Sequence, residues 1–252
     1  MEYEQDICTD SRNMDGGWAW QDVVRHLSRR GHIAHTPTLA GHGRGAMPRE
    51  ITHEDCVDSV VACIRHCNLE NVVLVGHSFG GTVVQRVAAR VPERIVRLVF
   101  VNALFVKDKE RVFDILPEVF LDSLAPKNGI QQPPLLSESS IEVLVPPPWE
   151  TWRGNFIQDA PESVARSTWE LLSPEPSQVN LDNIDLKFFD SLDIPKSFIF
   201  CRQDKAMPPS YFHPGMSSRL GTCKLLEMDG SHEVMFARPA ELAEKLVEAS
   251  TN

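Results

Sequence analysis

The sequence lacks the features of a membrane-spanning, secreted or nucleic-acid-binding protein. No apolar run is long enough to span a bilayer, and the start, MEYEQDICTD, has neither the basic residues nor the apolar stretch of a secretory signal. Its formal net charge of -10 would repel nucleic acid and anionic membrane surfaces. We therefore expect a cytoplasmic protein with no nucleic-acid or membrane partner.

Cysteine pairs with the C-x-x-C spacing of zinc and redox sites are also absent. The six cysteines are scattered, and we expect most of them to be buried, reduced thiols. Cys63 and Cys67 lie one helical turn apart and could share a metal, but no His, Asp or Glu spacing completes a tetrahedral set. The sequence therefore predicts no metal site.

Length and patterning favour one α/β domain. The chain has 252 residues, of which 42% are hydrophobic, enough for a full core and an inserted segment. Strand and helix patterns alternate, which predicts a mostly parallel sheet with helices on both faces. Thr52 and Asp55 form a potential capping box for a helix that ends near Cys67. Further helices are expected at 18–30, 82–90 and from Pro239, and strands near 32–39, 72–75, 95–101, 197–201 and 222–228.

The alternation fails in residues 107–195, which are rich in proline. We interpret this segment as a cap, or lid, inserted into a core formed by residues 1–106 and 196–252. An extension of the main core would use many of the same residues. Trp149 and Trp152 are candidate substrate-binding residues, because aromatic side chains in irregular sequence suit the wall of an apolar pocket. The aromatic residues in the segment include Phe113, Phe120, Trp149, Trp152, Phe156 and Trp169.

The segment VVLVGHSFGGTVV (72–84) has the pattern of a serine on a sharp turn. Its first four residues are all apolar, as in a strand buried on both faces, and after Gly81 the apolar spacing becomes helical. The glycines two residues before and after Ser78 remove Cβ atoms that would collide in such a turn. Ser78 is therefore predicted to adopt a strained backbone conformation with its hydroxyl projecting outward.

The same turn would place Ser78 at a helix N-terminus, where an oxyanion is stabilised. The backbone N–H of Phe79 is the expected oxyanion donor. The alternative is a glycine-rich connector that only packs closely or cradles a phosphate. However, G-x-x-x-G-G matches neither the dinucleotide pattern nor a P-loop, because no lysine follows the glycines.

A serine nucleophile requires a base and a group that orients the base. On a sheet of this kind the chain order is serine, acid, histidine, with the last two on loops after strands. Asp204 follows the strand SFIFC, and His232 follows the strand TCKLLEM. We predict a catalytic triad of Ser78, Asp204 and His232; alternatively, Asp204 and His232 are ordinary turn residues.

Other histidines are weaker candidates for the base. His26, His53 and His66 lie in predicted helices and are expected to face solvent. His77 is adjacent to the serine but should point away from its hydroxyl. His42, in the loop AGHGRG, could line the pocket and is a candidate substrate-binding residue.

With these residues in place, the chain resembles the α/β-hydrolases, and among them the methylesterase and hydroxynitrile-lyase-like branch with its bacterial esterase relatives. The resemblance covers roughly residues 16–247 and rests on GGWAWQDVVRHLSRRGHIAHTPTLAGHG, VVLVGHSFGGTVV, VRLVFVNAL, CRQD and GSHEVMFARPAELAEKL. It implies the α/β-hydrolase fold, a small helical cap, no cofactor, and carboxylic esters or cyanohydrins as substrates. In lyases resembling this branch a lysine follows the catalytic histidine, so Glu233 disfavours cyanide chemistry.

The start of the chain departs from the family pattern. The family's first core strand is apolar and ends in His-Gly, and the loop after it supplies a second oxyanion donor. Here Ser11 and Arg12 occupy the His-Gly position behind a poorly apolar segment. We therefore expect the first core strand to be degenerate or missing. The second backbone donor would come from near Arg12 or Asn13, and Arg12 could instead bind an anionic substrate group. Loss of one donor would slow hydrolysis by about 10²–10³-fold.

The sequence thus predicts a serine hydrolase that cleaves a small to medium, fairly apolar carboxylic ester, lactone or thioester through an acyl-enzyme on Ser78. One alternative is a lyase or cyclase of a biosynthetic pathway in which His232 is a general base without an acyl-enzyme. Another is a ligand receptor on a hydrolase fold. The expected partner is a small-molecule substrate, and the expected state is a monomer or homodimer.

Overall fold

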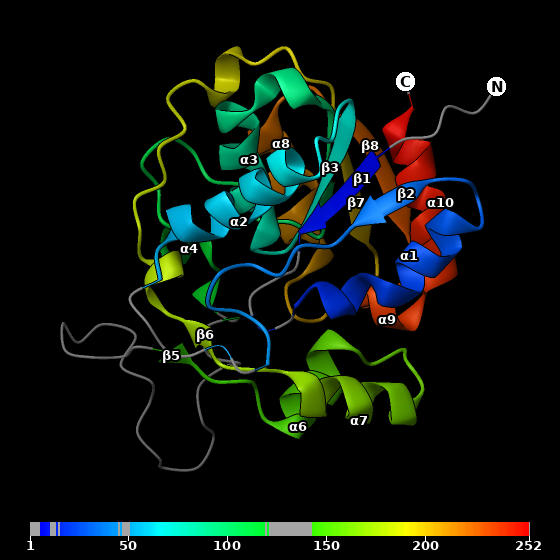
Figure 1. Ribbon diagram of the computed structural model, residues 1–252. Helices are drawn as coiled ribbons and strands as arrows, with labels where there is room; N and C mark the ends of the chain where they lie inside the picture. Colours follow the sequence, from blue (N-terminus) through cyan, green and yellow to red (C-terminus); the bar gives the residue numbers. More distant parts are fainter. Residues whose placement is uncertain are drawn as a thin grey trace.

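A six-stranded sheet forms the centre of the molecule (Figure 1). The computed structural model describes residues 6–10, 14, 16–44, 46, 51–118, 120 and 143–251. In the described part of the chain the sheet has the order β2-β1-β3-β4-β7-β8, and every neighbouring pair is parallel. The strands are β1 (Asp6–Asp10), β2 (Ile33–His35), β3 (Val72–His77), β4 (Ile95–Val101), β7 (Lys196–Cys201) and β8 (Lys224–Met228).

Helices cover both faces of the sheet, as the sequence predicted (Figure 1). The apolar residues of α2 (His53–His66) and α3 (Gly80–Arg90) pack against one face. Those of α1 (Gln21–Ser28) and α10 (Pro239–Ser250) pack against the other. The predicted capping box is confirmed: Thr52 Oγ1 accepts a hydrogen bond from the Asp55 N–H, and Asp55 accepts one from the Thr52 N–H. The shorter helices are η1 (Gly17–Trp20), η2 (Pro92–Arg94), η6 (Tyr211–Met216), α8 (Ser217–Leu220) and α9 (Val234–Ala237).

The first core strand, which was expected to be degenerate or missing, is present, so only the expectation of its absence is wrong. β1 lies inside the sheet and pairs along one edge with β2 and along the other with β3. Main-chain hydrogen bonds on two edges hold a strand regardless of its side chains, so a poorly apolar sequence can still form one. Ile7 is 1% exposed and belongs to the core on the α1 and α10 face.

Residues 107–195 connect β4 to β7, which are neighbours in the sheet. Helices α6 and α7 lie beyond the carboxyl ends of the strands (Figure 1) and share a small apolar core with η3. In contrast, Val179, Ile184 and Phe189 pack into the main core. The segment therefore both extends the core and covers one end of the sheet. In its described part the elements are α4 (Val112–Ile115), β5 (Val143–Leu144), α6 (Trp149–Thr151), η3 (Trp152–Phe156), α7 (Glu162–Leu171), β6 (Glu175–Pro176), η4 (Gln178–Asn180) and η5 (Phe189–Ser191).

Within the described ranges, no helix is both long enough and apolar enough to cross a bilayer.

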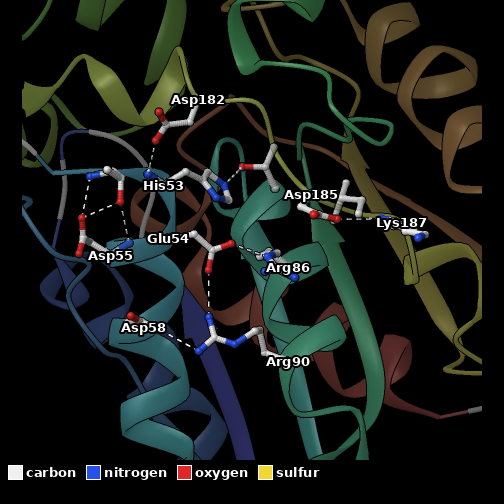
Figure 2. A network of polar contacts seen from close by, with 12 residues as sticks. His53, Glu54, Asp55, Asp58, Arg86, Arg90, Asp182, Asp185 and Lys187 are labelled. Carbon is white, nitrogen blue, oxygen red and sulfur yellow. Dashed lines mark hydrogen bonds and ion pairs between the residues drawn. The ribbon is translucent and has the colours of Figure 1, made fainter.

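A polar network joins α2 to α3 (Figure 2). The Glu54 carboxylate pairs with Arg86 and with Arg90, whose Nη1 lies 2.9 Å from Glu54 Oε2. His53, at the start of α2, is buried, and its Nε2 lies 3.0 Å from Thr82 Oγ1 on α3. The expectation that His53 faces solvent is wrong, because the first turn of α2 packs against α3. Burial lowers the pKa of His53 to about 4, so its ring is neutral near pH 7.

The buried His53 ring should make stability depend on pH. Folding lowers the pKa of His53 from 6.5 to about 4. Between these two pH values the ring is therefore protonated in the unfolded chain and neutral in the folded chain. The contribution of the neutral ring to stability is complete above pH 6.5 and is lost as the pH falls toward 4. The unfolding free energy of the unmodified protein should therefore fall between pH 7 and pH 5. In His53→Gln this fall should be smaller by about 2 kcal/mol, as measured by urea denaturation at the two pH values.

The control is His66→Gln, which changes an exposed histidine at the other end of α2. It should retain the full fall seen in the unmodified protein. The same fall in His53→Gln would contradict a neutral buried ring.

Candidate active site

The turn between β3 and α3 holds Ser78 in a left-handed conformation with φ of 51°. Its N–H donates to the Val101 carbonyl at 3.2 Å, and its carbonyl accepts from the Leu104 N–H at 2.8 Å. A Cβ on Gly76 would lie 2.6 Å from the Gly80 oxygen, and one on Gly81 would lie 2.4 Å from the Leu104 oxygen. Both glycines are therefore required by close backbone approaches, and the strained turn expected from the sequence is present.

Three side chains from separate strand ends form a hydrogen-bonded chain. His232 Nδ1 lies 2.6 Å from Asp204 Oδ2, and His232 Nε2 lies 3.1 Å from Ser78 Oγ. Because a carboxylate can only accept, Nδ1 carries the proton and Nε2 is left to accept from the serine hydroxyl. The structure thus brings together the three residues of the predicted triad, in an arrangement that can deprotonate a serine as it attacks a carbonyl.

Asp204 is fixed on both of its carboxylate oxygens. Oδ1 accepts the N–H groups of Ala206 at 2.9 Å and Met207 at 3.1 Å, while Oδ2 faces His232. Asp204 is 3% exposed as a residue, and its side chain is fully buried. These backbone donors compensate for burial of a negative charge and set the direction from which it meets the imidazole.

The backbone of His232 is held as well as its ring. Its carbonyl accepts from His77 Nε2 at 3.0 Å and from Asn102 Nδ2 at 3.4 Å. Asn102 Oδ1 in turn accepts from the N–H of Cys201, the last residue of β7. The rings of Phe156 and Phe212 lie 5.7 Å and 6.0 Å from the His232 ring. Side chains from four elements therefore limit the movement of this histidine.

Ser78 and His232 open into a cavity whose walls are mainly apolar. Aromatic residues of the 107–195 segment contribute to these walls, as the sequence suggested. Two polar residues of the same segment, Glu175 and Asn180, also line the cavity and were not identified from the sequence, because no local pattern marks them. Among the described residues, the others that line the cavity are Met14, Phe113, Leu116, Phe120, Leu144, Pro147 and Phe156.

The two tryptophans proposed as substrate-binding residues lie behind this wall. Trp152 is fully buried, stacks on Phe156 at 5.7 Å and donates its indole N–H to the Ala165 carbonyl. Trp149 packs under the Arg166 guanidinium, 3.6 Å from its ring centroid. Neither is among the described residues that line the cavity, so both support the wall rather than form its surface.

His42 is also near the site but not at its surface. It is 5% exposed, stacks on the Phe79 ring at 6.2 Å, and its Nε2 lies 3.9 Å from Glu175 Oε2. Burial lowers the pKa of His42 to about 4. The ring is therefore neutral near pH 7 and sits between the residue after Ser78 and the polar part of the cavity wall.

Of the residues expected to supply the oxyanion donors, only Phe79 belongs to the part of the chain that the structure describes. Phe79 follows Ser78 and precedes the first residue of α3, where N–H groups lack partners within the helix. Arg12 and Asn13 lie outside the described residues. Met14, just after them, lines the cavity, and its carbonyl accepts from the Ser173 N–H at 3.1 Å. The loop after β1 therefore reaches the site.

Among the described residues, two groups of side chains have the donor atoms of a metal site. In the first, His35 of β2 adds an imidazole to Cys63 and Cys67, and one ligand atom from each lies within 4.8 Å of the others. The sequence spacing did not reveal this histidine, because β2 meets α2 only in the folded chain. One imidazole and two thiolates could hold zinc with one position open. The second group is His77, His232 and Glu233.

The cysteines are more exposed than expected. In the described part of the chain Cys56 and Cys201 are buried, whereas Cys63, Cys67 and Cys223 are partly or fully exposed. The expectation that most cysteines are buried is therefore wrong: Cys63 is not among the buried residues of α2, and Cys67 follows the end of this helix.

Comparisons with known proteins agree with this geometry. Residues 13–245 match the model of the alpha/beta hydrolase family. A carbendazim hydrolyzing esterase from a Nocardioides species is 27% identical over 92% of this chain and 93% of its own length. Salicylic acid-binding protein 2 of Nicotiana tabacum is 24% identical over 92% of both chains. A solved extracellular alpha/beta-hydrolase from a Paenibacillus species is 31% identical with a TM-score of 0.87, covering 99% of this chain and 100% of that chain.

The close approaches at the turn lead to a prediction about stability. We expect Gly81→Ala to destabilise the protein by about 1–3 kcal/mol, because the Cβ of the new alanine would overlap the Leu104 carbonyl and force the turn apart. Thermal unfolding measures the effect. Gly154→Ala is the matched control, since no atom lies within 4 Å of its added Cβ. Equal melting temperatures for the two variants would contradict the close packing of the turn.

Proposed function

Because the chain belongs to the alpha/beta hydrolase family, we propose that this enzyme cleaves carboxylic esters with Ser78 as nucleophile, His232 as general base and acid, and Asp204 as the group that orients His232. The observation that carries the proposal is the continuous chain of contacts from Asp204 Oδ2 through both ring nitrogens of His232 to Ser78 Oγ. The carbendazim hydrolyzing esterase, which is similar to this chain over most of its length, favours the same reaction class.

The proposed reaction has two halves. Ser78 Oγ attacks the ester carbonyl while His232 Nε2 takes its proton, and the imidazolium is stabilised by Asp204. His232 then gives the proton to the departing alcohol, which leaves an acyl group on Ser78. Water, deprotonated by His232, attacks this acyl-enzyme and releases the acid.

Two backbone donors would stabilise the oxyanion formed in each half. We assign one to the Phe79 N–H, at the amino end of α3. The other we place in the loop after β1, at or near Asn13, with Arg12 close to the substrate. The presence of β1 and the position of Met14 at the cavity support this assignment, because they bring that loop to the site.

The walls of the cavity favour a small to medium, fairly apolar acyl group, in an ester, lactone or thioester. Phe113, Phe120 and Phe156 are among the apolar residues that line it. We propose that residues 107–195 form the cap over a core of residues 1–106 and 196–252, since most of the lining comes from this segment. The alternative of a lyase or cyclase that uses His232 as a general base without an acyl-enzyme was suggested by the departure from His-Gly at Ser11 and Arg12. The oxygen-18 experiment below distinguishes it from ester hydrolysis.

We expect Ser78→Ala to lose at least about 10⁴-fold in kcat on p-nitrophenyl esters and to lose labelling by a serine-directed phosphonate. Asp204→Asn should lose about 10⁴-fold, because the amide favours the wrong tautomer of His232. Asp229→Asn is the matched control: this exposed carboxylate pairs with Arg202 and should leave kcat within about twofold. Turnover retained in Ser78→Ala would exclude the nucleophile assignment.

Acyl-enzyme hydrolysis also predicts where solvent oxygen goes. In water enriched in oxygen-18, the acid product should carry the label, and rapid quenching followed by intact-mass analysis should show one acyl group on the protein. That mass should be missing in Ser78→Ala. Unlabelled product from the unmodified enzyme would instead indicate elimination or C–C cleavage.

A further inference from the structure

A histidine and two cysteines meet where β2 lies next to α2. His35 is the last residue of β2, Cys63 lies in α2, and Cys67 follows the last residue of this helix. One ligand atom from each of these side chains lies within 4.8 Å of the other two. The cluster lies away from the proposed ester hydrolysis, because Cys67 precedes β3 whereas Ser78 follows the other end of that strand.

The helix backbone holds the two cysteines on the same side of α2. The Cys67 N–H donates to the Cys63 carbonyl at 3.0 Å, so the last helical turn includes both residues. Residues one turn apart project from the same side of a helix. The inner face of α2, which includes Val57, Val60 and Ile64, is buried in the core, so the helix cannot rotate freely. Packing therefore positions both thiol groups.

The sheet holds the histidine. β2 pairs in parallel with β1, and His35 is the last residue of β2 in this pairing. The main-chain bonds of the ladder fix the position from which its imidazole approaches α2. Strand and helix are both in place before an ion arrives, so binding requires little loss of conformational entropy.

The spacing of the donor atoms suits a metal ion better than a disulfide. Cβ atoms one helical turn apart are separated by about 5–6 Å, whereas a disulfide needs about 3.5–4.5 Å. Tetrahedral zinc, with bonds of about 2.3 Å to sulfur and about 2.0–2.1 Å to nitrogen, places its ligand atoms about 3.5–3.8 Å apart. Donor atoms within 4.8 Å of one another reach this arrangement through side-chain movements of about 1 Å, and α2 stays helical.

The chemistry of the donor set selects zinc. Thiolate sulfur and imidazole nitrogen are ligands that zinc prefers, whereas magnesium and calcium require oxygen. His35 and Cys63 are partly exposed and Cys67 is exposed, so an ion can enter from solvent. Each of the three side chains also has another interaction in the folded chain. Coordination of zinc by thiolates is much stronger than a single hydrogen bond, so such interactions do not prevent binding.

We propose that His35, Cys63 and Cys67 bind one zinc ion, which joins β2 to α2. β2 is a three-residue strand at the edge of the sheet that the structure describes. Residues 36–52 connect this strand to α2, and the ion fastens the two elements on either side of the connection. Three protein ligands leave one position of the tetrahedron to water. The role of the ion is to stabilise the fold, not to take part in ester hydrolysis.

Zinc binding is measured on the reduced, metal-free protein. In competition with a chromophoric chelator, we expect one zinc ion per chain with a Kd below about 10 µM, weaker than a structural site with four protein ligands. Cobalt(II) in place of zinc should give the charge-transfer absorption of thiolate ligands and the visible bands of tetrahedral coordination. Zinc at about 100 times its Kd should raise the melting temperature by about 5–10 °C. Magnesium at the same concentration should leave the melting temperature unchanged.

Variants assign the ligands. Cys63→Ser, Cys67→Ser and His35→Gln should each weaken zinc binding by at least about 100-fold, because each removes one of three ligands. The matched controls are Cys223→Ser, which changes a partly exposed cysteine outside the cluster, and His66→Gln, which changes an exposed histidine of α2. Both should keep the Kd of the unmodified protein. Melting temperatures without zinc check that every variant is folded.

Two results from the unmodified protein would overturn the site without any variant. One is a Kd for zinc above about 10 µM, and the other is a cobalt form without thiolate absorption. Binding retained at full strength in folded Cys67→Ser or His35→Gln would also overturn it, as would an equal loss in Cys223→Ser and Cys67→Ser. Ester hydrolysis is measured separately through kcat, so the failure of either proposal leaves the other intact.

Discussion

The close packing of α3 against the carboxyl ends of β3 and β4 is the constraint on which the site depends. Ser78 hydrogen-bonds through its N–H to Val101 and through its carbonyl to Leu104, so the turn is tied to the neighbouring strand. These bonds hold a residue at φ of 51°, a conformation that is costly for a side chain with a Cβ. Only glycine at 76 and 81 lets the backbones come close enough. The position of Ser78 is therefore fixed by the packing of α3 against the strands of the sheet.

Parallel pairing then brings the remaining polar groups to the same edge. β7 and β8 follow β4 in the sheet, and the loops after them carry Asp204 and His232. Each residue is held by bonds that have no role in proton transfer: two backbone N–H groups hold the Asp204 carboxylate, while His77 and Asn102 hold the backbone carbonyl of His232. The imidazole is thus oriented before a substrate binds, which lowers the reorganisation needed in the transition state.

Neutral histidines serve a different purpose around Phe79. His42 stacks on its ring at 6.2 Å, and His53 meets it edge-on at 5.7 Å. Both are buried with a pKa lowered to about 4, so neither brings a charge next to the nucleophile near pH 7. His42 also connects this packing to Glu175 in the cavity wall. The nucleophile turn and the polar wall are therefore parts of one packed unit.

Local patterns in the sequence were sufficient for the serine turn, the Thr52 capping box, the layered sheet and the chain order of the three polar residues. Each depends on short-range spacing or on a rule of parallel sheets, so neighbours in sequence carry the information. Only the tertiary structure decided the rest. β1 forms through main-chain pairing, which its side-chain sequence does not predict. His53 is buried by α3, a helix that is distant from it in sequence. Glu175 and Asn180 reach the cavity because a long connection folds back over the strand ends, and no local period encodes that path.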